Sequence, residues 1–148
     1  MRVSAKGEYA MLAMYELARN HASTGVLTID QIARRQSIPH PFLAQILQDL
    51  KKSGLVESRR GAGGGYRLAS HPRDVSLGQV LRLIDGPVLP FKCSVSCNGV
   101  NSCPRAETCP VSYVWNDVRD AIEGVLDSTT FEDVLNGKSS PQVAVAGS

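Results

Sequence analysis

The sequence predicts a mainly α protein: a winged helix-turn-helix head with a two-stranded β wing, followed by a long C-terminal dimerisation helix. Three observations lead to this fold class. Two helical patterns meet at a tight turn over residues 36–39, glycines over 61–65 separate two extended segments, and a long apolar stripe recurs at helical spacing in the C-terminal half. We expect three parts: the winged helix-turn-helix domain, of a kind that binds DNA, over residues 1–75, a loop with dimerisation helices over 76–136, and a disordered tail over 137–148.

Composition and charge limit the class of protein. With 148 residues, 43% of them hydrophobic, the chain can form one domain-sized core. Its N-terminus lacks the apolar run of a signal peptide, and no stretch approaches the roughly 18 apolar residues of a membrane span, so we expect a cytoplasmic protein. Residues 1–73 hold 11 Lys+Arg against 5 Asp+Glu, whereas residues 74–148 hold 5 against 9. This distribution favours contact between the N-terminal half and a polyanion, although chance segregation of solvated charges would give the same pattern.

The first predicted helix covers residues 6–20. Its apolar stripe consists of Leu12, Ala13 and Leu17, which recur at helical spacing. Gly25 then interrupts the helical pattern, so we expect a loop between this helix and the next one.

A capping box opens the second helix, because the side chains of Thr28 and Gln31 can each bond the other residue's backbone N–H. We expect this helix to end near Arg35. The residue before a proline is driven out of helical conformation, so residues 36–39 form a turn. A third helix is expected over residues 39–53. Its apolar face comprises Phe42, Leu43, Ile46, Leu47 and Leu50.

The wing is predicted directly after the third helix, which Gly54 ends in a left-handed cap. Two short extended segments, residues 55–60 and 66–68, flank the glycines of residues 61–65 and indicate a β-hairpin. A glycine-rich loop also binds phosphate in nucleotide-binding folds. No helix follows this loop and no Gly-Lys-Ser/Thr motif occurs, so nucleotide binding is poorly supported.

The head carries side chains suited to DNA. We place Arg59 and Arg60 at the base of the wing, where guanidinium groups can enter a narrow minor groove. Lys51, with Lys52 beside it, is expected at phosphates, and the third helix at the major groove, where glutamine can bond adenine twice. The candidates are Pro39, His40, Pro41, Gln45 and Gln48 on the helix and Gly63, Gly64 and Tyr66 on the wing. Each alone fits an ordinary exposed polar surface; the turn, wing and basic bias together predict DNA binding.

The second half predicts three further helices. A capping box of Ser76 and Gln79 opens one that ends near Asp85, before Gly86-Pro87. After Pro110 begins a long helix. Its apolar stripe comprises Val111, Val114, Trp115, Val118, Ile122, Val125 and Leu126. The stripe is longer than the head requires, so we expect it to pack on a second copy of the chain; covering its own domain is the alternative. A short last helix begins with a cap at Thr130 and carries Phe131, Val134 and Leu135.

All four cysteines lie within residues 93–109. Gaps of five residues separate Cys97, Cys103 and Cys109, and Cys93 lies just upstream. This segment has little apolar content, so burial alone cannot hold it in place. Clustered thiolates either form disulfides or bind a soft metal centre. The reducing cytoplasm disfavours disulfides, which favours the metal; a metal-free group of thiols stays open.

Four features together resemble the IscR/NsrR family of bacterial iron–sulfur transcription regulators. They are the spaced cysteines and three segments: Met1-Arg-Val-Ser-Ala-Lys-Gly-Glu-Tyr-Ala, Gly54-Leu-Val and Arg60-Gly-Ala-Gly-Gly-Gly-Tyr66. The similarity covers about residues 1–136. It implies a homodimer joined through the long helix and bound to a pseudo-palindromic promoter site in double-stranded DNA. It also implies an iron–sulfur cluster held by Cys97, Cys103 and Cys109.

The resemblance leaves the fourth cluster ligand open. IscR-type members have a histidine three residues after the last cysteine, where this chain has Ser112. NsrR-type members use an acidic residue near the start of the first helix, supplied by the other protomer, and this chain has Glu8 there. Cys93 is the rival ligand, and Glu8 also fits a first-turn acid facing the helix dipole. A [2Fe–2S] cluster is favoured over a [4Fe–4S] cluster, with zinc as a further alternative.

These expectations describe a regulator and not an enzyme. The protein would be an iron–sulfur-dependent repressor of transcription that senses iron–sulfur status, oxidant or nitric oxide. His21, His40 and His71 have no nucleophile placed beside them in any inferable way. The alternative is a metal-free or zinc-containing winged-helix repressor that responds to thiol oxidation or to a sulfur metabolite.

Overall fold

A computed structural model describes residues 2–87, 105 and 108–138. Cys93, Cys97 and Cys103 lie outside these residues, as does nearly all of the tail expected from residue 137 onward. Of the cysteines, only Cys109 belongs to the described part of the chain.

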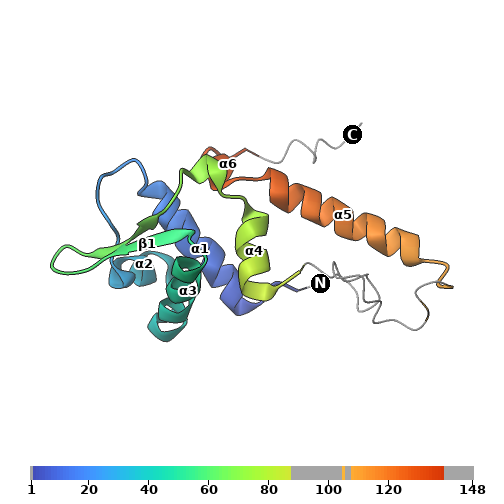
Figure 1. Cartoon of the computed structure of the whole chain (residues 1–148), viewed down its shortest axis with the longest axis horizontal. Helices are drawn as coiled ribbons and strands as arrows, with labels where there is room; N and C mark the ends of the chain where they lie inside the picture. The colour runs from blue at the N-terminus through green and yellow to red at the C-terminus, as the bar shows by residue number, and fades with distance from the viewer. Residues whose placement is uncertain (1, 88–104, 106–107, 139–148) are drawn as a thin grey trace.

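The described residues form a helical head, a two-stranded hairpin and a long helix. In Figure 1, α1 to α4 gather beside the hairpin, whereas α5 extends away from this head. The mainly α fold with a two-stranded wing is therefore confirmed. The elements are α1 (Ala5–Arg19), α2 (Ile29–Gln36), α3 (His40–Lys52), β1 (Val56–Arg59), β2 (Gly65–Leu68), the 3-10 helix η1 (Pro72–Asp74), α4 (Leu77–Asp85), α5 (Ser112–Ser128) and α6 (Phe131–Leu135).

The core of the head lies between α1 and α3. Fully burying one leucine or isoleucine contributes about 1.5–3 kcal/mol, so the buried side chains of these two helices dominate the stability of the head. The principal contributors are Ala10, Ala13, Met14 and Leu17 from α1 and Leu43, Ile46, Leu47 and Leu50 from α3.

Two residues predicted in apolar stripes are corrected by the structure. Leu12 is 38% exposed, because α1 buries the face of Ala10, Met14 and Leu17, which lies on nearly the opposite side of the helix. Phe42 is 53% exposed. It lies beside the buried face of α3 instead of within it, and its ring contacts the Tyr9 ring on α1 with centroids 6.1 Å apart.

The core continues beyond the hairpin. Val75 before α4, Val80 within it and Phe131 at the start of α6 are buried in the same cluster as the α1 and α3 side chains. The α4 and α6 helices thus pack on the head, and α5 connects them from outside.

Side-chain caps fix where the helices begin. Capping boxes pair Thr28 with Gln31 at α2 and Ser76 with Gln79 at α4, as predicted. At α6, Thr130 is the cap and its partner is Asp133. Each box satisfies backbone N–H groups that have no partner inside the helix.

A fully buried carboxylate joins α1 to α2. Glu16 accepts hydrogen bonds from Gln36 Nε2 at 2.6 Å and Arg19 Nη1 at 3.0 Å, and Arg35 Nη1 lies 3.4 Å away. A buried carboxylate requires such partners, because transferring a charged group out of water without hydrogen bonds costs much free energy. The sequence pattern does not predict the burial of Glu16.

The base of α5 is tied to α4, whereas its length is not buried. Arg82 on α4 pairs with Asp127 at 2.6 Å, and the Leu77 N–H donates to the Thr129 carbonyl at 2.9 Å. Within the described chain, no side chain of α5 is fully buried; its apolar stripe is half-buried and leaves part of its surface accessible. None of the helices described is long and apolar enough to cross a membrane.

Candidate nucleic-acid interface

A tight turn sets α3 against α2. Ser37 adopts a left-handed conformation (φ 53°, ψ 41°), which reverses the chain after α2. Ile38 is buried and anchors the turn in the core, and Pro39 is the N-cap residue of α3, with Pro41 in its first turn. The predicted helix-turn-helix is therefore present.

One side of α3 is polar and open to solvent. Every helix residue predicted to contact DNA is exposed, and most of them share a surface opposite the buried leucines. The spacing puts Pro41, Gln45, Gln48 and Lys52 on one outer face of α3, with His40 and Lys51 at the edge of that face and Pro39 at the N-cap.

Two of these side chains are held by acidic partners. His40 Nε2 lies 3.4 Å from Asp30 Oδ1 at the start of α2. Gln45 Nε2 donates to Asp49 Oδ1 at 3.1 Å, and Asp49 Oδ2 accepts from Lys6 Nζ at 2.8 Å. The pair Lys6 and Asp49 is not predictable from the sequence, since only the packing of α1 on α3 brings these two residues together.

The hairpin register corrects the position of the wing arginines. Val56 pairs with Leu68 at the base of the hairpin, and Arg59 pairs with Gly65 at the other end, beside the loop. Arg59 and Arg60 therefore lie near the tip of the wing. The prediction placed them at the base because it could not fix where the strands cease to pair.

The wing is bonded to the segment that precedes α2. Leu27 N–H donates to the Tyr66 carbonyl at 2.9 Å, and Tyr66 N–H donates to the Leu27 carbonyl at 2.7 Å. Tyr66, predicted to contact DNA, is half-buried and packs on the core. The backbone of the wing is thus fixed relative to the helix-turn-helix.

Close backbone approaches explain the glycines of the wing. A Cβ on Gly64 would lie 2.3 Å from the Arg59 carbonyl oxygen, and one on Gly65 would lie 2.4 Å from the Leu27 carbonyl oxygen. Gly63 has a φ of +80°, which disfavours other residues. Gly63 and Gly64, both predicted to contact DNA, therefore have a structural reason to be glycine.

Cations are exposed at both ends of this surface. Lys51, Lys52, Arg59 and Arg60 form no ion pair with another described residue. By contrast, Arg67 on β2 is paired with Glu57 at 3.0 Å. The unpaired cations can meet a phosphate backbone without first breaking an internal bridge.

The predicted metal ligands are only partly described. Cys109 is half-buried three residues before α5, and Glu8 is exposed in the first turn of α1. Within the described residues, no three histidine, cysteine or acidic side chains form a group that could hold a metal. The proposed set of Cys93, Cys97, Cys103, Cys109 and Glu8 mostly falls outside them.

The first turn of α1 is joined to the end of α4. Asp85 accepts hydrogen bonds from the Ser4 N–H at 3.0 Å and from the Ser4 hydroxyl. A Cβ on Gly7 would lie 2.6 Å from the Asp85 carboxylate, so glycine permits this approach. In sequence, the segment that carries the cysteines follows Asp85.

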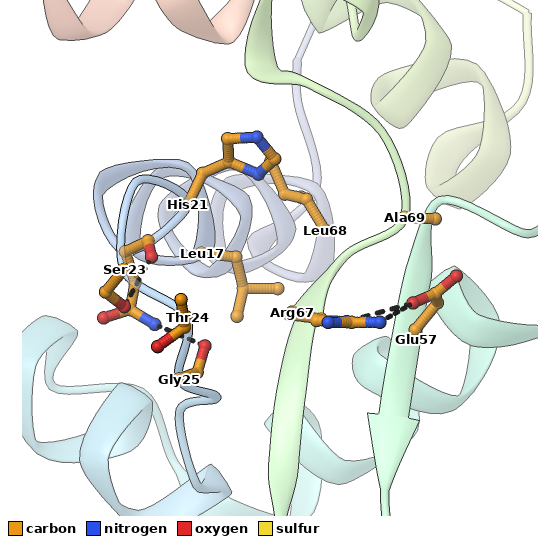
Figure 2. A pocket seen from close by; sticks show the side chains of 10 residues that line it. Leu17, His21, Ser23, Thr24, Gly25, Glu57, Arg67, Leu68 and Ala69 are labelled. Carbon is orange, nitrogen blue, oxygen red and sulfur yellow. Dashed lines mark hydrogen bonds and ion pairs between the residues drawn. The ribbon is translucent and has the colours of Figure 1, made fainter.

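A separate polar hollow of about 290 Å³ lies between the end of α1, the loop after it and the hairpin (Figure 2). The His21 ring and the Ser23 hydroxyl, labelled there, point in different directions. Ser23 Oγ donates to the Asn20 carbonyl at 2.9 Å. The His21 ring packs against the His71 ring, with the ring centroids 4.9 Å apart. This hollow therefore contains no serine–histidine pair of the kind a hydrolase uses.

Comparison with known proteins places this geometry in context. A family model described as "Rrf2: Iron-dependent Transcriptional regulator" matches residues 3–137. The chain is 34% identical over 144 residues to the HTH-type transcriptional regulator IscR of Pectobacterium atrosepticum, covering 97% of this chain and 85% of the relative. It is also 34% identical over 144 residues to the HTH-type transcriptional regulator CymR of Bacillus subtilis, covering 97% and 96%.

The chain is also similar to solved structures of CymR and IscR. The structure of CymR, titled the global cysteine regulator of B. subtilis, matches with a TM-score of 0.76 and 34% identity, covering 94% of this chain and 99% of the other. T. potens IscR matches with a TM-score of 0.72 and 35% identity, covering 100% and 94%.

Proposed function

Since the chain belongs to the Rrf2 family of winged helix-turn-helix transcriptional regulators, we propose that it is a DNA-binding repressor controlled by an iron–sulfur cluster. The regulator class and the absence of an enzyme role follow from the family. The cluster, the signal and the direction of regulation are the proposal. The protein would act in the cytoplasm on iron–sulfur status, oxidant or nitric oxide.

The exposed polar side of α3, flanked by unpaired cations, carries the DNA-binding part of the proposal. With α3 in the major groove, His40, Gln45 and Gln48 meet base edges, and Lys51 meets phosphate. Arg59 and Arg60 at the tip of the wing then reach the neighbouring minor groove, whose negative potential attracts guanidinium groups.

The accessible stripe of α5 supports a homodimer. A helix that keeps valine, isoleucine and leucine side chains at the surface of its own chain is suited to cover the same helix of a second copy. Two heads would then read a pseudo-palindromic site with half-sites about one helical turn apart.

Cys97, Cys103 and Cys109 are the ligands that we propose for the cluster, because thiolates are the donors that iron–sulfur centres require. Glu8 of a second protomer or Cys93 would complete the set. A carboxylate is a harder and more easily displaced ligand than a thiolate, which suits a centre that must respond to a small reactive molecule. When bound, the cluster would supply a redox- and ligand-sensitive charge; we favour [2Fe–2S] over [4Fe–4S].

The Ser4–Asp85 joint offers a route from the cysteine segment to the head. A rearrangement of that segment would act on the end of α4, and through Ser4 on the first turn of α1. Because α1 packs on α3, the placement of the recognition helix would change. Half-sites at fixed spacing make affinity sensitive to such a shift.

The similarity to CymR favours a second candidate function. That relative is titled a cysteine regulator, so this chain is alternatively a metal-free or zinc-containing repressor that responds to thiol oxidation or a sulfur metabolite.

Anaerobic purification separates the two candidates. We expect a coloured protein with iron and acid-labile sulfide in similar amounts, and we expect Cys103→Ala to lose both the visible absorbance and the cluster-dependent part of DNA affinity. Cys93→Ala serves as the matched comparison and should keep the colour if Glu8 is the fourth ligand. Colourless protein that contains zinc or no metal would instead favour the second candidate.

A further inference from the structure

Three side chains from two helices form a chain of hydrogen bonds that ends at the DNA-facing side of α3. The Lys6 ammonium, in the first turn of α1, donates to Asp49 Oδ2 at 2.8 Å. Asp49 Oδ1 accepts from the Gln45 amide at 3.1 Å, one helical turn away along α3. Gln45 is exposed beside Gln48 and Pro41, whereas Asp49 faces α1. The base-facing amide is therefore tied to a helix that lies behind it.

The chemistry of Asp49 determines how the amide is turned. The hydrogen bond from Lys6, with smaller effects of Gln45 and Lys52, lowers the pKa of Asp49 below its ordinary value, so the carboxylate is ionised at neutral pH. An ionised carboxylate accepts hydrogen bonds and donates none, so the NH₂ group of Gln45 must face it. The side chains of Lys6 and Asp49 are 36% and 26% exposed, which shields this pair from water more than a fully exposed bridge.

We propose that Asp49, held in place by Lys6, is a specificity-positioning residue that orients the Gln45 amide for base recognition. In this orientation the Gln45 carbonyl oxygen and its second N–H are left for the duplex. One acceptor and one donor side by side match the N6–H and N7 of adenine. A glutamine free to rotate could equally accept from cytosine or donate to guanine. The inference rests on the proposed function, in which α3 enters the major groove.

The competing explanation is local. Side chains four residues apart on a helix surface often interact, and such a pair can stabilise the helix without any effect on recognition. The two explanations differ in one measurable respect. Orientation of Gln45 predicts that Asp49 affects the preference at a single base position and only while Gln45 is present. Helix stabilisation predicts an equal effect on all duplexes.

The test uses the full-length protein and duplexes that it selects from a random-sequence pool. Affinities are then measured for the selected duplex and for each single base-pair substitution in one half-site. We expect Gln45→Ala to abolish the preference for adenine at one position. Asp49→Asn, which keeps the shape but can donate as well as accept, should lower the same preference about fivefold or more. In the Gln45→Ala background, Asp49→Asn should cause no further loss, because the two residues act as one unit.

Two further variants guard against misinterpretation. Glu57→Gln removes the same charge from the head on β1, where its partner is Arg67, so it should leave every base preference unchanged. Lys6→Met releases Asp49 without altering α3, and it should weaken the preference at the same position. If Asp49→Asn fails to fold, as thermal unfolding would reveal, Lys6→Met and its combination with Gln45→Ala carry the test.

The outcomes separate the inference from the function on which it rests. If Gln45→Ala removes the adenine preference and neither Asp49→Asn nor Lys6→Met alters it, the positioning role is wrong and base reading by Gln45 stands. Additive effects of Gln45→Ala and Asp49→Asn also overturn the positioning role. If Gln45→Ala changes no preference, the contact proposed for Gln45 is wrong, and the inference is lost with it. If no duplex is selected, the DNA-reading function itself fails.

Discussion

At the scale of single residues, Glu16 is the only charged side chain that is buried in the described part of the chain. Its carboxylate gathers Arg19, Arg35 and Gln36 at the junction of α1 and α2. A buried acid in this position stabilises the fold only while its partners surround it. Its partner Gln36 ends α2 directly before the turn that leads into α3, so the loss of Glu16 would loosen the support of the recognition surface.

We predict that Glu16→Ala lowers the free energy of unfolding by about 2–4 kcal/mol, through a cavity and the loss of charged hydrogen bonds. The measurement is urea-induced unfolding followed by circular dichroism. Glu57→Ala is the matched control, because Glu57 also pairs with an arginine but its side chain is 50% exposed. It should change the stability by no more than about 1 kcal/mol. Equal losses in the two variants would contradict the role given to burial.

Residue identities on α3 could be read from the sequence, whereas their partners could not. The spacing of apolar residues was sufficient to place Gln45 and Gln48 on the outer side of α3. Nothing local connects Lys6 to Asp49, which is 43 positions further along the chain. Glu16 has the same difficulty, since a helical glutamate is ordinarily a surface residue and only tertiary packing encloses it.

At the scale of elements, the hairpin is extended by a third segment. Leu27, just before α2, pairs with Tyr66 on the outer side of β2. Gly65 is required at the point where these two backbones meet, because a side chain there would strike the Leu27 carbonyl. The wing is therefore held to the rest of the head by backbone hydrogen bonds as well as by the buried pair Val56 and Leu68.

We predict that Gly65→Ala separates the wing from Leu27 and lowers stability by about 1–3 kcal/mol, as overpacking does. Amide hydrogen exchange should show faster exchange at Leu27 and Tyr66, and DNA affinity should fall. In Gly25→Ala the added Cβ would meet its nearest neighbour at 3.8 Å, an ordinary contact, so this variant is the control. Unchanged exchange at Leu27 in Gly65→Ala would show that the hairpin tolerates the shift.

The elements were predicted more reliably than their edges. Capping boxes predicted the starts of α2 and α4, and a cap at Thr130 that of α6, because such signals depend on a few adjacent residues. The position of Arg59 relative to the wing was wrong, since strand pairing depends on the partner strand and on the loop geometry. The pairing of Leu27 with Tyr66 was not predicted either, because an isolated pair of backbone groups leaves no pattern in the sequence.

At the scale of the whole molecule, α5 is attached at one end and accessible along its length. Arg82 and Asp127 hold its C-terminal end to α4. The remaining turns extend away from the head (Figure 1). Their valine, isoleucine and leucine side chains are only half-buried by the described residues. We therefore expect a second copy of the chain to cover this helix.

Val118→Asp should shift the protein from dimer to monomer, since burying an uncompensated charge in an interface costs several kcal/mol. Analytical ultracentrifugation over a range of concentrations measures the change, and affinity for a two-half-site duplex should fall with it. Asp117→Ala, on the polar side of the same helix, should leave the dimer intact. A wild-type protein that sediments as a monomer would show that the stripe has another role.

The two hydrogen bonds between Leu27 and Tyr66 also limit how the head can fit DNA. Helix and hairpin cannot adjust their separation to suit a given stretch of duplex, because the same short backbone segment fixes both. The head therefore fits only a narrow range of distances between neighbouring grooves of the DNA. Where the groove spacing of a duplex differs from the spacing between α3 and the wing, the DNA must twist or bend to fit the protein.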